Sequence, residues 1–170
     1  EDEDLAVDEV KRFVASGGST IVETTSVGIA RSPKSLALIS RMSGVNIVMG
    51  SGYYIAASHP AYVSYKTEND IADEIISDII YGVEDTGVKS GFIGEIGCSW
   101  PLTPDEKKVL RASAIAQKKT GASIIIHPGR DVQAPFNILD ILGEAGADIK
   151  RGVMGHIGRT YPDVDLVIKL

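Results

Sequence analysis

The chain alternates segments of helical periodicity with short, nearly continuous apolar runs, and this alternation constrains the fold more than any other feature. Apolar residues recur at helical spacing in each long segment, and a run of strand length lies between every two of them. The predicted helices are 4–18, 32–44, 70–85, 103–121, 134–148 and the start of one over 163–170, and the predicted strands are 19–25, 45–54, 90–97, 122–130 and 151–160.

The clearest helix covers residues 103–121. Thr103 is placed to cap its N-terminus, Pro104 occupies the first helical position, and Glu106 completes a capping box. Gly121 ends it. We therefore expect one strand to finish before Thr103 and the next to begin after Gly121.

Strands that are apolar along their whole length and alternate with helices predict a parallel sheet covered by helices, which is an α/β fold. The candidate architectures are an open doubly wound sheet and a (β/α)8 barrel. In both, functional residues gather at the C-terminal ends of the strands. No GxGxxG or GxxxxGK[ST] motif follows any predicted strand, which disfavours the nucleotide-binding form of the open sheet.

Composition excludes several classes of function. The 170 residues are 44% hydrophobic and 24% charged, as in an ordinary soluble domain. The formal net charge of -6 argues against a nucleic-acid partner, because phosphate binding needs a basic surface. No apolar run is long enough to cross a membrane, and the acidic residues 1–10 are unlike a signal peptide. With a single cysteine, Cys98, these features predict a cytoplasmic protein with no membrane partner.

Three consecutive predicted strands carry a metal-binding type of residue near their ends. Glu95 interrupts an apolar strand, His127 closes the next, and His156 closes the one after it. A buried unpaired carboxylate is costly, so Glu95 requires a positive partner. One carboxylate and two imidazoles suit a divalent metal such as zinc. The alternatives are a Lys or Arg partner for Glu95 and histidines that only form structural hydrogen bonds.

These residues carry a resemblance to a known family. The motifs GFIGEIG, IIIHPGR and GHIGRT, separated by helix-length intervals, resemble the middle of the phosphotriesterase family in the amidohydrolase superfamily. The stretches GEIGCSWPLT and AGAD are most similar to its animal branch, the phosphotriesterase-related proteins. The resemblance covers almost the whole chain and implies a (β/α)8 TIM barrel, here incomplete, with about the second to sixth strands and their helices.

The resemblance also implies a cofactor and roles for particular residues. Members hold two metals, usually zinc, at the C-terminal mouth of the barrel. Glu95 corresponds to the ligand that bridges both metals, and His127 and His156 correspond to ligands of the more exposed one. Tyr54 matches a tyrosine that points at the metals in lactonase relatives, although an aromatic side chain packed under the loop explains it equally well.

Some parts of the family pattern have no counterpart in this sequence. These are a His-x-His pair on the first strand and an aspartate on the eighth. We interpret residues 1–170 as a partial metal-dependent hydrolase barrel that lacks the first, seventh and eighth strands. A truncated form without half of the metal centre would be catalytically inactive.

Two arginines predict the kind of substrate. Arg130 and Arg159 each follow a predicted metal-binding histidine by three residues. A guanidinium so close to a cationic centre is poorly placed unless an anion lies between them. The animal relatives hydrolyse N-acetyltaurine, a small anionic amide with a sulfonate, and the implied reaction uses a metal-activated hydroxide. Alternatively, the arginines pair with Asp131 and Asp163, and the substrate is an ester, lactone or phosphotriester.

The remaining candidates are weaker. His59 lies in a loop without the strand-end position of the other histidines, but we count it among the residues that could line the substrate pocket. Cys98 and Trp100 follow the strand of Glu95 and either shape the pocket floor or simply pack. The sequence does not determine the oligomeric state, and a homodimer is one of the options.

Overall fold

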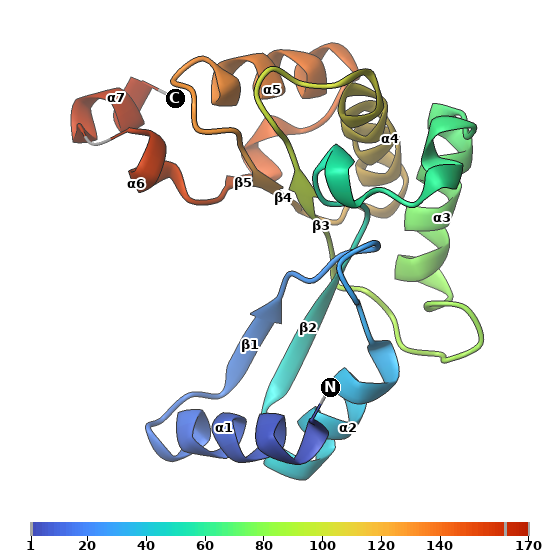
Figure 1. Cartoon of the computed structure of the whole chain (residues 1–170), viewed down its shortest axis with the longest axis vertical. Coiled ribbons are helices and arrows are strands. Elements are labelled where there is room, and N and C mark those ends of the chain that lie inside the picture. Colours follow the sequence, from blue (N-terminus) through green and yellow to red (C-terminus); the bar gives the residue numbers. More distant parts are fainter. Residues whose placement is uncertain (1, 162, 170) are drawn as a thin grey trace.

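The computed structural model describes residues 2–161 and 163–169. Five strands alternate with helices along the chain (Figure 1). The strands are β1 (Thr20–Glu23), β2 (Asn46–Ser51), β3 (Phe92–Gly97), β4 (Ile124–His127) and β5 (Gly152–Met154). The helices are α1 (Glu3–Ala15), α2 (Pro33–Ser43), α3 (Glu68–Ile80), α4 (Pro104–Thr120), α5 (Ala134–Glu144), α6 (Ile157–Thr160) and α7 (Val164–Lys169), with short 3-10 turns η1 (Ala56–Ser58), η2 (Ala61–Ser64) and η3 (Ile149–Arg151).

The sheet has the strand order β1-β2-β3-β4-β5, and every neighbouring pair is parallel. A doubly wound sheet reverses direction at a switch point, whereas a barrel adds each new strand beside the last. The unbroken order therefore selects the barrel from the two predicted architectures. The five strands form an incomplete (β/α)8 barrel.

The predicted caps of α4 are confirmed. The Thr103 side chain accepts a hydrogen bond from the Glu106 N–H, and the Glu106 carboxylate accepts one from the Thr103 N–H. Gly121 ends the helix in the left-handed region, with a φ of 70°. Helix α4 then packs on β3, beside α3 and α5.

The structure corrects the ends of two predicted helices. Helix α3 stops at Ile80 rather than at residue 85, and α5 stops at Glu144 rather than at residue 148. A glycine with positive φ follows each true end, Gly82 at 111° and Gly146 at 82°. Such a backbone conformation cannot continue a right-handed helix, although apolar residues follow at helical spacing.

The prediction of a strand over 151–160 was wrong beyond Met154. Residues Gly152–Met154 pair with β4, and the chain then turns at His156, which has a φ of 52°, into the short helix α6. The turn brings Arg159 back toward the end of β4, where a straight strand would have carried it away.

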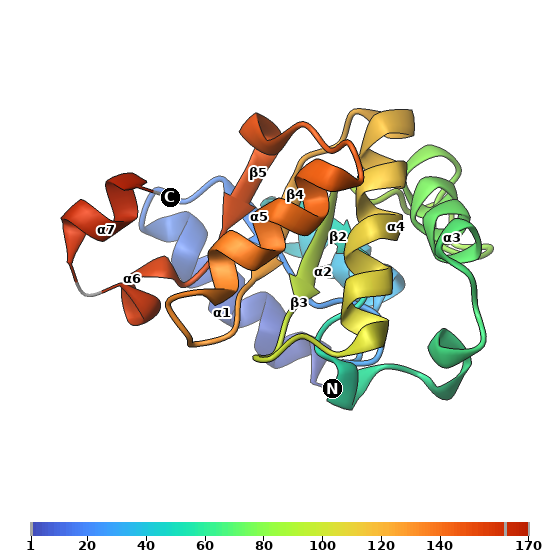
Figure 2. The same ribbon diagram turned by 90° about the horizontal axis from the view of Figure 1, so that it is seen from above.

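Helices group at the outside of the sheet in two sets. Helices α1 and α2 lie together beside β1 and β2, while α3, α4 and α5 lie side by side over the later strands (Figures 1 and 2). The main apolar core lies between the central strands and α3 and α4; its fully buried side chains include Ile71, Ile75, Ile93, Ile96, Leu110 and Ile126. No helix in the described part of the chain is both long and apolar enough to span a membrane.

Burial falls off toward the two outer strands. Strand β3 is buried at five of its six positions, but Val22 on β1 and Val153 on β5 are each 52% exposed. Apolar strand residues are normally covered on both faces in a parallel sheet. Packing is therefore most complete at β3, in the middle of the sheet, and decreases toward the outer two strands.

Candidate metal centre

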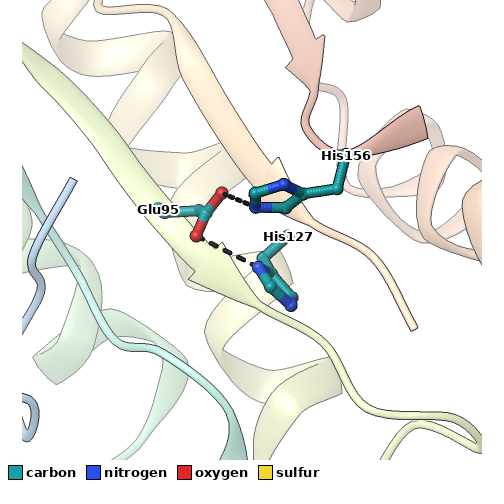
Figure 3. A group of neighbouring side chains, drawn as sticks. All are labelled: Glu95, His127 and His156. Atoms are coloured by element: carbon teal, nitrogen blue, oxygen red, sulfur yellow. Dashed lines mark hydrogen bonds and ion pairs between the residues drawn. The ribbon is translucent and has the colours of Figure 1, made fainter. Parts of the chain in front are cut away.

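Glu95, His127 and His156 converge at the C-terminal end of the sheet (Figure 3). One ligand atom from each lies within 4.8 Å of the others. The Glu95 Oε2 is 3.2 Å from Nδ1 of His127, and its Oε1 is 3.2 Å from Nε2 of His156. The carboxylate thus faces both imidazoles at once.

A bulge in β3 positions Glu95. Ile93 pairs with Ile124 but Ile96 pairs with Ile126, so β3 has one more residue than β4 over this interval. Gly94 lies in the bulge with a φ of 127°, and a Cβ there would be 2.3 Å from the Ile125 carbonyl oxygen. Only glycine fits this close approach of two strands.

His127 is the last residue of β4, and its carbonyl accepts a hydrogen bond from the Cys98 N–H at 2.8 Å. Its ring packs edge-on against His156, with ring centroids 4.6 Å apart. Burial lowers the pKa of His127, and the charge of Arg159 lowers it further, while Glu95 opposes both effects. A neutral imidazole, the form with a free lone pair for a metal, is therefore favoured.

His156 lies just beyond β5 in a left-handed conformation, which is uncommon for a residue other than glycine. The preceding residue, Gly155, donates a hydrogen bond to the Ile126 carbonyl at 2.8 Å. A Cβ on Gly155 would be 3.1 Å from the Glu95 Oε1. The His156 side chain remains 48% exposed, so one side of the group is open to water or substrate.

Tyr54 contacts His127. Its hydroxyl is 3.1 Å from both ring nitrogens, and the rings meet edge-on with centroids 4.9 Å apart. Partial burial raises the pKa of Tyr54, and Glu95 raises it further, against the effect of Arg159. The side chain therefore remains a neutral phenol able to donate a hydrogen bond at the site.

The two predicted arginines lie on the same cavity, of about 630 Å³, next to His127. Arg159 donates to the Pro128 carbonyl at 2.6 Å, and its Nη2 is 3.1 Å from Nε2 of His127. Arg130 is exposed. Within residues 2–161 and 163–169, neither arginine forms the alternative ion pair with Asp131 or Asp163.

Motif reasoning found only part of this cavity. Ser99, Gly129 and Asp131 also line it, with Tyr54, Ile55, Cys98, Trp100 and the residues above. Ser99 and Gly129 lie inside the motifs GEIGCSWPLT and IIIHPGR but have no predicted role of their own, and Asp131 is predicted only as a partner for an arginine. Their signal is positional, since each follows a strand whose end carries a predicted ligand.

The structure does not bring His59 into this cavity. Its Nε2 is 2.8 Å from the Tyr54 carbonyl oxygen, and its ring packs edge-on against Tyr53. In this position His59 supports the loop that carries Tyr54. A direct contact of His59 with substrate stays a prediction.

The residues present fit a divalent metal. Among the described residues, Glu95 pairs with two histidines and with no lysine or arginine. A carboxylate oxygen and two imidazole nitrogens are ligands that zinc prefers, and a catalytic zinc keeps an open position beside them. Glu95, His127 and His156 are placed so that they could hold an ion of this kind.

Comparison with known proteins gives the group a context. The sequence model of the phosphotriesterase family matches residues 2–170. The chain belongs to this family. It is 47% identical over 166 residues to the N-acetyltaurine hydrolase of Dictyostelium discoideum, a match that covers 98% of the chain and 45% of that protein. The chain thus spans about half the length of this relative of the phosphotriesterase family.

Solved structures of related proteins have the same fold. A resiniferatoxin-binding protein from Rhodobacter sphaeroides superimposes with a TM-score of 0.95 at 40% identity, over 99% of this chain and 47% of that one. The phosphotriesterase homology protein from Escherichia coli, complexed with phosphate in its active site, gives a TM-score of 0.91 at 27% identity, over 99% and 58%. The phosphotriesterase-family fold predicted from the sequence motifs is confirmed.

Proposed function

We propose that the protein is a metal-dependent hydrolase of small N-acyl amides, with N-acetyltaurine and related N-acetyl amino acids as its substrates. The observation that carries the proposal is the group Glu95, His127 and His156 beside a cavity that also contains Arg130 and Arg159. The name of the Dictyostelium relative supports the amide as substrate. The reaction consumes one water and yields acetate and taurine.

We further propose that the cofactor is a pair of zinc ions in the full-length protein. Glu95, His127 and His156 would hold metal at this edge of the sheet, and the other ligands would come from the first and eighth strands of a complete barrel. Divalent metals bound there would polarise the acyl oxygen and lower the pKa of water so that it attacks at neutral pH. Residues 1–170 would then be a partial barrel, inactive without the remaining ligands.

The side chains of the cavity would orient the substrate. The guanidinium groups of Arg130 and Arg159 would bind the sulfonate, because an anion relieves their repulsion from a cationic centre. Tyr54, whose hydroxyl lies 3.1 Å from the His127 ring, would donate a hydrogen bond to the acyl group. The amide would thereby be held with its carbonyl toward Glu95 and its charged end toward the arginines.

A second candidate substrate class is a phosphotriester, ester or lactone. The observation in its favour is the phosphate bound in the active site of the related Escherichia coli protein. The same cavity accepts either a sulfonate or a phosphoryl group next to the two arginines. A substrate panel separates these classes from the amide.

The proposal extends to the setting of the protein. We infer a cytoplasmic enzyme that acts on a small molecule, since its one cysteine, Cys98, is free and buried. A homodimer is compatible with this function.

The test measures acetate release from N-acetyltaurine by the longest form of the protein and by residues 1–170, each with and without a chelator. We expect release by the long form only, abolished by the chelator and restored by added zinc. Release that survives chelation would contradict the metal-dependent mechanism. Turnover of esters, lactones or phosphotriesters without any acetate release would move the substrate to the second class.

A further inference from the structure

Glu106, in the first turn of α4, makes more hydrogen bonds than a helix cap requires. Its Oε2 accepts one from the Thr103 N–H at 2.9 Å, which is the capping-box bond. Oε1 also accepts from the N–H of Ala56 at 3.0 Å and from that of Ser99 at 3.1 Å. Oε2 accepts another from the Ser99 hydroxyl at 2.7 Å. The carboxylate thus joins three segments of the chain.

A second capping box, at the start of α3, has no role beyond capping its helix. Asp70, in the first turn of α3, accepts hydrogen bonds from the N–H and the hydroxyl of Thr67. Within the described residues its carboxylate accepts no hydrogen bond from any other residue, and Asp70 is exposed. Glu106, in contrast, is 0% exposed. The difference between the two boxes is therefore not explained by helix capping.

The charge of Glu106 is stabilised by its donors alone. No lysine or arginine in residues 2–161 and 163–169 forms an ion pair with it. Burial by itself would raise the pKa of Glu106, but the hydrogen bonds from Ala56, Thr103 and Ser99 outweigh burial and lower it. An ionised carboxylate with four such donors holds them strongly, since each hydrogen bond is charge-assisted.

The donors belong to two of the loops that line the cavity. Ala56 follows Tyr54 by two residues in the loop after β2, and Ser99 precedes Trp100 in the loop after β3. The loop after β2 lies directly against the end of β3, because a Cβ on Gly97 would be 2.2 Å from the Ile55 nitrogen. A shift of either loop would therefore move the cavity wall relative to His127.

We propose that Glu106 is a positioning residue of the active site: its carboxylate fixes the loops after β2 and β3 to each other and thereby sets Tyr54 and Trp100 over the cavity. The catalytic part of this inference rests on the proposed function. The structural part, that one carboxylate holds both loops, does not.

The test compares Glu106→Gln with the matched control Asp70→Asn in the longest form of the protein, loaded with zinc. Glutamine keeps the shape of the side chain but loses the charge and turns one end into a donor that faces N–H groups. We expect hydrogen exchange to accelerate in peptides covering 54–58 and 98–102, while zinc content stays unchanged. We also expect kcat/KM for N-acetyltaurine to fall roughly 10- to 100-fold. Asp70→Asn should change exchange only at the start of α3.

Two results would overturn the proposal. One is unchanged exchange in both loops of Glu106→Gln, and the other is accelerated exchange with kcat/KM unchanged from wild type. If Glu106→Gln does not fold, Ser99→Ala removes the hydrogen bond to Glu106 at 2.7 Å, together with a longer one to the Pro101 carbonyl at 3.3 Å, and should lower kcat/KM about fivefold. Unchanged kcat/KM in Ser99→Ala would then mean that Glu106 only caps and stabilises its helix.

The two proposals fail in distinguishable ways. If the wild-type protein releases no acetate, the proposed function is wrong, and the exchange comparison still decides whether Glu106 holds both loops. If wild type is active and only the exchange prediction fails, the proposed function stands and the positioning role does not.

Discussion

At the scale of single residues, Arg130 and Arg159 have different surroundings although their sequence positions are equivalent. Arg159 is anchored by the Pro128 carbonyl at 2.6 Å and contacts the His127 ring. Arg130 is exposed on the same cavity. Substitution of Arg159 would therefore disturb His127 as well as the substrate, whereas substitution of Arg130 tests the anion-binding role alone.

We predict that Arg130→Ala raises KM for N-acetyltaurine about 10-fold or more, because one charge-assisted hydrogen bond to the sulfonate is lost. Steady-state kinetics with N-ethylacetamide, which has no anionic group, provides the control and should give the wild-type kcat/KM. An equal loss on both substrates would mean that the arginine acts on the site itself rather than on the anion.

At the scale of elements, β3 and α5 each contain a glycine, but only the glycine in β3 is required by its surroundings. Gly94 has a φ of 127° and lies against the Ile125 carbonyl, while Gly143 in α5 has nothing within 4 Å of an added Cβ. We therefore expect substitution by alanine to have opposite effects on stability at the two positions. It should destabilise the fold at Gly94, in the bulge that carries Glu95, and stabilise it at Gly143, on the surface of a helix.

Gly94→Ala should lower the free energy of unfolding by roughly 2–5 kcal/mol, through the clash and the strained backbone. Gly143→Ala should raise it by about 0.5–1 kcal/mol, because alanine loses less entropy in a helix. Urea denaturation of both variants measures the difference. Equal stability of Gly94→Ala and wild type would show that the bulge tolerates a side chain.

The buried carboxylate of Glu106, in α4, leads us to predict that the fold loses stability in acid. The pKa of Glu106 is lowered from its ordinary value of 4.5 in the folded chain, so the carboxylate stabilises the fold above pH 4.5 and this contribution is lost as the pH falls through the folded value. Glu106→Gln cannot titrate there. Its free energy of unfolding should therefore lie below that of wild type at neutral pH and approach it as the pH is lowered. A difference in the free energy of unfolding between the two proteins that stays constant from pH 6 to pH 3 would contradict this role of Glu106.

At the scale of the whole molecule, the sheet has two outer strands with exposed apolar residues. Val22 on β1 and Val153 on β5 are each 52% exposed, whereas the residues paired with them on the inner strands, Val48 and Ile125, are only partly exposed. Outer strands of this kind pair readily with other chains. The half-barrel is therefore better packed at its middle strands, and its two outer strands are open to pairing with other chains.

We predict that residues 1–170, produced alone, self-associate through these outer strands. Val22→Lys and Val153→Lys together should shift the sedimentation profile toward a monomer, because a charge opposes strand pairing. The midpoint of thermal unfolding should stay close to that of the parent chain. The same oligomer in parent and double variant would place the association elsewhere on the surface.

Much of the fold was predictable because it depends on local signals. The apolar runs predicted all of the strands, and the residues from Thr103 to Gly121 predicted α4 with its caps, since a capping box and a terminal glycine act within a few residues of chain. The family motifs likewise predicted the family. The convergence of Glu95, His127 and His156 followed from parallel strands, whose C-terminal ends meet at one edge.

Tertiary structure decided the rest, because those features depend on contacts between residues far apart in the chain. The bulge at Gly94 exists only against β4, and the turn at His156 replaced a predicted strand by α6. The local sequence predicted Glu106 only as part of a helix cap. Its carboxylate also accepts a hydrogen bond from the N–H of Ala56, 50 residues away. The sequence by itself determined the alternation of strands and helices and the caps of α4. Only packing determined which loops one buried carboxylate would join.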